Sequence, residues 1–132
     1  MDENNSIQLF EDRKIRTAWD EEQGEWYFSV QDVVAVLAES SDPKQYIKKM
    51  RARDPELSAN WGTICTPVQM PAADGKMRKI QAANTEGLLR IIQSIPSPKA
   101  EPFKRWLAQV GRERIEETID PEQAIDRALE NY

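Results

Sequence analysis

Proline is the residue that most restricts this 132-residue chain, which contains eight prolines. Proline lacks the backbone N–H that helix interiors and central strands use, so it occupies helix starts, turns and sheet edges. The Asp-Pro pairs at 42–43 and 120–121 each combine an N-cap residue with a proline for the first helical turn, and both predict a helix start. Asp-Pro at 54–55 and Pro-Ser-Pro at 96–98 predict helix ends. The chain is therefore expected to fold from short elements.

Three short β-prone runs open the chain, at residues 7–10, 15–19 and 26–28. A charged stretch separates the first two runs, and residues 20–25 separate the second from the third. Gly24 lies in this second connection and can take the positive φ of a tight turn. The pattern predicts a small antiparallel sheet.

A β-hairpin is predicted in the middle of the chain. The extended runs at 64–70 and 77–82 flank an Asp-Gly turn at 74–75, which is typical of a hairpin. Pro67 and Pro71 confine the first of these strands to a sheet edge or shorten it.

Apolar residues at helical spacing predict about five helices, so the fold class is α+β: a small antiparallel sheet and a β-hairpin packed with helices. Ser29 and Asp32 fit a capping box at the start of the first helix. Thr85 is the expected cap of a buried helix that is apolar nearly all round. A loop is expected through residues 60–62. The predicted helices span about residues 30–38, 43–53, 85–95, 103–110 and 120–132.

The formal net charge of −5 hides a basic middle. Residues 1–42 carry 3 basic and 11 acidic side chains, residues 43–114 carry 14 and 6, and residues 115–132 carry 1 and 6. Basic residues concentrated in this way indicate contact with nucleic acid. The acidic total fits a protein-binding role equally well.

The helix predicted at 43–53 holds five basic residues and no acidic residue. A short helix, a brief turn and this basic helix resemble a helix-turn-helix, in which the second helix can lie along a DNA groove. Phosphate contacts would provide most of the affinity, and glutamine is a candidate for reading a base. The alternative is a solvated helix whose charges balance the acidic flanks. The expected DNA-contacting residues are Lys44, Gln45, Lys48, Lys49 and Arg51.

The predicted hairpin adds a second group of basic residues, Lys76, Arg78 and Lys79, just after its turn. A basic β-ribbon can also enter a groove or contact a DNA backbone. Strand alternation places Arg78 on the face opposite Lys79, so the three side chains cannot all point the same way. An ordinary exposed hairpin is the alternative interpretation.

Enzyme chemistry finds little support in the residues. Histidine is absent and Cys65 is the single cysteine, which removes intramolecular disulfides, Cys/His zinc sites and imidazole-based catalysis. Residues 41–44 match Ser-x-x-Lys, but the companion motifs of such enzymes are missing. The acidic clusters at 20–25 and 113–122 have no defined ligand spacing. We therefore expect no enzyme activity, no bound metal and no cofactor.

A membrane location is not expected either. The longest apolar run, residues 33–38, is far shorter than the roughly 20 residues that cross a bilayer. The first eight residues lack a basic start followed by an apolar stretch, so a secretory signal is not predicted. A cytoplasmic location is the expectation.

Two stretches together resemble the Bro-N domain of prophage antirepressors and baculovirus repeated-ORF proteins. Residues 26–37, WYFSVQDVVAVL, are similar to the aromatic strand and Asp-Val helix of that family. Later, the Gly-Leu pair at 87–88 and the pattern Ala-x-x-Phe-x-x-Trp at 100–106 are similar to two of its helices. The resemblance covers about residues 7–117. It implies an α+β, DNA-binding domain of proteins that switch prophage or viral gene expression.

The C-terminal part carries a second resemblance. Residues 120–129, DPEQAIDRAL, are similar to longer proteins related to DNA-damage-inducible protein D, which continue past this point. The expected organisation is a single Bro-N-like domain over 1–132, with its core at about 7–117. Residues 118–132 are expected to form a C-terminal helix that is a candidate for the start of a further region.

The function expected from these features is that of a DNA-binding regulatory domain of a phage-type antirepressor or transcriptional regulator. Duplex DNA is the expected partner, ahead of single-stranded DNA. The alternative is a protein-interaction module that binds a repressor or a recombination protein, with the acidic flanks steering it to a basic partner. A second copy of the chain is a further candidate partner.

Overall fold

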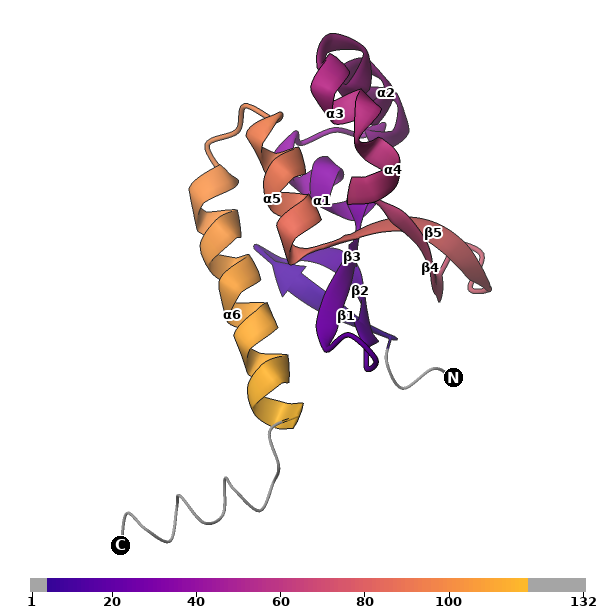
Figure 1. Cartoon of the computed structure of the whole chain (residues 1–132), viewed down its shortest axis with the longest axis vertical. Coiled ribbons are helices and arrows are strands. Elements are labelled where there is room, and N and C mark those ends of the chain that lie inside the picture. Colours follow the sequence, from indigo (N-terminus) through magenta and orange to yellow (C-terminus); the bar gives the residue numbers. More distant parts are fainter. Residues whose placement is uncertain (1–4, 119–132) are drawn as a thin grey trace, which may run out of the picture.

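The computed structural model describes the backbone of residues 5–118 and the side chains of residues 6–110. Within this range the chain forms an antiparallel sheet with the strand order β1-β2-β3-β5-β4, together with six helices (Figure 1). The α+β prediction is therefore confirmed. The helix predicted at 120–132 lies outside the described residues.

The strands are β1 Asn5–Phe10, β2 Arg13–Asp20, β3 Glu25–Ser29, β4 Thr66–Pro71 and β5 Met77–Asn84. The helices are α1 Val30–Leu37, α2 Pro43–Arg53, α3 Pro55–Ala59, α4 Trp61–Ile64, α5 Thr85–Gln93 and α6 Ala100–Thr118.

The sheet contains both predicted β-units. Strands β1, β2 and β3 form the expected antiparallel unit, and Gly24 takes φ +65° in the β2–β3 turn. Strands β4 and β5 form the expected hairpin, and β4 lies at the sheet edge, where Pro67 and Pro71 are tolerated. Pairing of β3 with β5, from Tyr27 opposite Asn84 to Ser29 opposite Ala82, joins the two units into one sheet. The sequence did not indicate this pairing.

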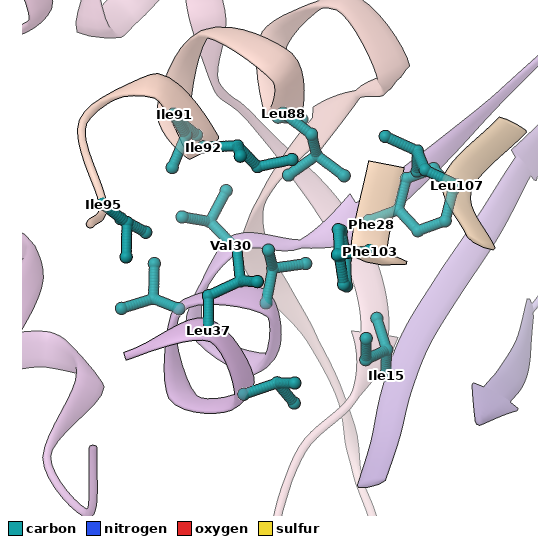
Figure 2. Packing of buried hydrophobic residues seen from close by; sticks show 14 of the residues in the cluster. Ile15, Phe28, Val30, Leu37, Leu88, Ile91, Ile92, Ile95, Phe103 and Leu107 are labelled. Atoms are coloured by element: carbon teal, nitrogen blue, oxygen red, sulfur yellow. The ribbon is translucent and has the colours of Figure 1, made fainter. Parts of the chain in front are cut away.

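The main core lies between one face of the sheet and helices α1, α5 and α6 (Figure 2). Phe28 from β3, Val30 from α1, Leu88 from α5 and Phe103 from α6 are all completely buried. Burial of a side chain of this size contributes about 1.5–3 kcal/mol, so this junction of four elements is a main source of stability. The stripe predicted in the Phe103 helix is confirmed.

The opposite face of the sheet carries a second, smaller cluster. Ala18 from β2 packs with Met70 from β4 and Ala82 from β5, and Tyr27 borders them. Contact between β2 and β4, which are not neighbours in the strand order, shows that the sheet curls over on this side.

An ion pair between Arg16 and Asp32 joins β2 to α1. The Asp32 carboxylate accepts hydrogen bonds from the Arg16 backbone N–H at 2.9 Å and from its Nε and Nη2 at 2.8 Å each. The same guanidinium donates to the Pro71 carbonyl at 2.9 Å, which adds the end of β4. Hydrogen bonding to Asp32 raises the pKa of Arg16 despite its partial burial.

The cap of α1 is only half of the predicted capping box. The Ser29 hydroxyl accepts from the Asp32 backbone N–H at 3.3 Å, as expected. The Asp32 carboxylate, however, is bound by Arg16 instead of reaching back to the cap. A long-range partner has replaced the local one because Arg16 offers charged donors.

Two other local predictions are wrong. Residues 60–62, expected as a loop, hold the N-cap and the first two residues of α4. Residues 55–59 before them form α3, which begins where the Asp54 side chain accepts from the Leu57 N–H at 3.0 Å. Helix α5 is capped by Asn84, whose side chain accepts from the Gly87 N–H, and Thr85 is its first residue. This helix is buried on one side only, since Leu89 is 37% exposed.

Gly87 allows α5 to pack closely against α4. A Cβ built at Gly87 would lie 2.7 Å from the Ile64 carbonyl oxygen and 3.2 Å from the Ala83 side chain. Since 2.7 Å is shorter than real Cβ contacts and the neighbour is backbone, any larger residue must push α4 away.

We predict that Asp32→Ala lowers the free energy of unfolding by about 2 kcal/mol, because it leaves a half-buried guanidinium without its carboxylate. Urea denaturation measures this change. Glu101→Ala is the control, since its ion pair with Lys104 is exposed and should contribute less than about 1 kcal/mol. Equal effects of the two substitutions would contradict the role given to the Arg16–Asp32 pair.

We also predict different effects for two glycine substitutions. Gly87→Ala should destabilise the protein by about 1–3 kcal/mol through the clash with α4. Gly62→Ala, which meets no atom within 4 Å, should leave stability unchanged or raise it by up to about 1 kcal/mol. Thermal unfolding of both variants provides the test, and a stable Gly87→Ala protein would refute the close-packing argument.

Candidate nucleic-acid interface

Helix α2 spans Pro43–Arg53, where the sequence predicted a helix. The Asp42 side chain accepts a 3.2 Å hydrogen bond from the Gln45 N–H, and Pro43 fits the first turn. Ile47 and Met50 are buried and anchor the helix to the core. The apolar stripe therefore fixes which side of α2 faces solvent. Figure 1 shows α2 and α3 together at one end of the molecule.

The solvent side of α2 carries four of the predicted contact residues. Lys44, Gln45, Lys48 and Lys49 are all exposed. None of these three lysines forms an ion pair with another described residue, and α2 itself contains no acidic side chain. Their positive charges are therefore available to an external anion.

Arg51, the fifth predicted contact residue, differs from the lysines. It is half-buried, and its guanidinium carbon lies 5.0 Å from the ring centroid of Trp61, a cation–π arrangement. Its buried Nε and the buried Nε1 of Trp61 have no hydrogen-bond partner among the described residues. Arg51 therefore belongs to the basic helix α2 and at the same time packs against Trp61 of α4. The sequence showed no sign of this pairing.

A groove of about 360 Å³ runs between α2 and α3 and brings three predicted residues together. Lys44, Lys48 and Arg51 line it, as their i, i+4, i+7 spacing predicted. Ser58 of α3 completes the lining with apolar Ile47 and Ala52. Sequence reasoning missed Ser58 because no helix was predicted for residues 55–59. Gln45 and Lys49 lie outside the groove.

The remaining arginines near α2 serve the fold. Arg53 donates to the Ser94 carbonyl at 2.9 Å, and its guanidinium lies 5.5 Å from the Tyr46 ring centroid. Arg90 pairs with Asp54 at 3.3 Å. The pKa of Asp54 is lowered, first by its bond from the Leu57 N–H and then by its side-chain partners, including Arg90. These contacts tie the end of α2 to α5.

The basic residues of the hairpin form a separate surface. Lys76, Arg78 and Lys79 are exposed, and the hairpin projects from the side of the molecule, away from α2 (Figure 1). Arg78 is already paired with Asp74 at 2.5 Å. The sequence therefore predicted two groups of cations that the fold does not bring together, and α2 carries the larger number of cations without a described ion-pair partner.

An acidic hollow of about 590 Å³ lies between the β2–β3 turn and β4. Asp20, Glu21 and Glu22 line one side of it, and Tyr27 is also exposed to it. Burial raises the pKa of Tyr27, and the nearby carboxylates, chiefly Glu25, add to this shift. No group of three or more His, Cys, Asp or Glu suited to a metal ion occurs among the described residues.

We predict that Cys65 resists alkylation in the folded protein. Burial raises the pKa of its thiol to about 12, with a smaller opposing effect from Arg51, so very little thiolate exists at mildly alkaline pH. The unfolded thiol, with a pKa of about 8.5, should react quickly in concentrated guanidinium chloride. Iodoacetamide labelling followed by mass spectrometry compares the two states. Rapid labelling of the native protein would contradict the burial.

Comparison with known proteins identifies one family. The model of the BRO family, N-terminal domain, matches residues 14–113. This match includes α2, the α2–α3 groove and the hairpin. It ends before residues 120–129, so it does not test the second resemblance, which was predicted for that stretch. No curated protein and no solved structure matches the chain. Among the described residues, no helix combines the length and apolar character needed to span a membrane.

Proposed function

Since this chain belongs to the BRO family through its N-terminal domain, a domain associated with regulatory proteins, we propose that it binds duplex DNA as part of an antirepressor or transcriptional regulator. One observation supports this most directly. Lys44, Lys48 and Lys49 are exposed on one helix and pair with no described carboxylate, in a chain whose total charge is −5. In a net acidic protein, such a concentration of cations favours a polyanionic partner.

The chemistry of α2 suits the DNA backbone. Lysine ammonium groups contact phosphates and release condensed counterions, which is the main source of sequence-independent affinity. Acidic side chains are absent from α2, so repulsion from within the helix does not oppose the approach of DNA. Gln45 lies outside the groove on the same exposed helix and is the candidate for a base contact. Lys76 and Lys79 of the hairpin are candidates for a second, weaker backbone contact.

The alternative function, recognition of a basic protein partner, is favoured by a different feature. The acidic hollow beside the β2–β3 turn offers Asp20, Glu21 and Glu22 to a cationic segment. The acidic hollow is distinct from α2, so protein binding and DNA binding should be weakened by substitutions at different residues. Substitution of the α2 lysines should leave such a protein partner bound.

We predict that Lys44→Glu combined with Lys48→Glu lowers affinity for labelled random duplex DNA at least about tenfold and flattens the dependence of log affinity on log salt. Fluorescence anisotropy across a salt series measures both quantities. Arg51 is left intact because a glutamate there would lose the Trp61 contact and would test folding instead of binding.

The matched control is Lys76→Glu combined with Lys79→Glu, which makes the same charge change on the hairpin. We expect this variant to retain most of the affinity. Equal losses in the two double variants would show a bulk charge effect and would refute the assignment to α2. Absence of binding by the unmodified protein even at low salt would refute DNA binding and favour the protein-partner function.

A further inference from the structure

The lining of the α2–α3 groove has an unusual chemical composition. Three cationic residues, Lys44, Lys48 and Arg51, line the groove together with Ser58, and no described carboxylate does. Ile47 and Ala52 supply the apolar part of the wall. The groove therefore offers charged and neutral hydrogen-bond donors beside a partly apolar wall, which suits the two non-bridging oxygens of a phosphodiester.

We propose that this groove holds one phosphate of the DNA backbone, bound by Lys44, Lys48, Arg51 and the hydroxyl of Ser58. The site rests on the proposed DNA-binding function, because DNA supplies the phosphate. The proposed site goes further than that function, because it makes α3 part of the interface and assigns a phosphate contact to Ser58. It also separates the groove-lining cations of α2 from Lys49, which lies outside the groove.

Arg51 is held in position before any ligand arrives. Its guanidinium lies over the Trp61 ring, and Trp61 is itself 4% exposed within the core. A guanidinium fixed by stacking loses little conformational entropy when it binds an oxyanion. No described residue accepts a hydrogen bond from Arg51 or pairs with its charge. Its charge in the free protein is therefore not neutralised by any described carboxylate.

Ser58 is available in the same way. Its backbone N–H donates to the Asp54 carbonyl at 3.0 Å, which keeps it within α3, and its hydroxyl has no described partner. A hydroxyl at the edge of a cationic groove is a neutral donor to phosphate oxygen. Because the hydroxyl carries no charge, its removal should weaken binding without changing the number of counterions that DNA releases on binding.

This difference between charged and neutral contacts provides the test. Single variants of the intact chain are titrated with labelled random duplex DNA across a salt series, with thermal unfolding as the folding check. Lys48→Ala should weaken binding and reduce the salt slope by about 1, the signature of one lost phosphate contact. Ser58→Ala should weaken binding about fivefold and leave the salt slope unchanged.

Lys49→Ala is the matched control, because it removes the same charge from an exposed position of the same helix outside the groove. Because Lys49 adds to the positive field of α2 without lining the groove, we expect its salt slope to fall clearly less than that of Lys48→Ala. Arg51→Lys retains the charge and loses the planar fork, so it should weaken binding with the slope unchanged.

The results of these titrations distinguish failure of the phosphate site in the groove from failure of the proposed DNA-binding function. Equal effects of Lys49→Ala and Lys48→Ala, together with a silent Ser58→Ala, would overturn the groove while leaving DNA binding through α2 intact. DNA binding that is absent, or that none of these variants changes, would overturn both the groove and the proposed role of α2.

Discussion

The pairing of Arg16 with Asp32 connects three parts of the chain that are distant in sequence. Arg16 belongs to β2, Asp32 to the first turn of α1, and the Pro71 carbonyl that also accepts from Arg16 ends β4. The two paired side chains are only 21% and 18% exposed, so their attraction is less weakened by water than that of a surface pair. Because α2 starts soon after α1 ends, the orientation of α1 also determines where the basic helix can lie.

The fold divides its cations into those that hold the structure and those that pair with no described carboxylate. Separate parts of the fold are bridged by Arg53, Arg90 and Lys99. The single Lys99 ammonium pairs with both Glu11 and Glu39. Arginine suits such bridging because its planar fork donates in several directions at once. The α2 lysines remain outside these networks. This division could not be read from charge counts, since a paired and an unpaired cation look alike in a sequence.

The domain has two charged surfaces of opposite sign. The lysines of α2 lie at one end of the molecule, and the acidic hollow lies against the β2–β3 turn and β4. The acidic surface is consistent with the net charge of −5, while the basic surface depends on a helix that contains no acidic residue. Segregation of charge lets a net acidic protein attract a polyanion to one surface, because the field close to α2 differs in sign from the field of the whole molecule.

The features that the sequence by itself determined are local ones. β-prone runs and turn residues predicted the strands, and Pro67 and Pro71 predicted the edge position of β4. Helical spacing predicted α1, α2 and the apolar stripe of α6, and the Bro-N resemblance agreed with the family match. These signals lie within a few residues of one another, where sterics, capping and periodicity decide the conformation. Tertiary structure alone decided the β3–β5 pairing, the stacking of Arg51 on Trp61 and the approach of Ser58 to α2. Such contacts join elements whose relative positions depend on how the whole core packs, and no local pattern encodes them.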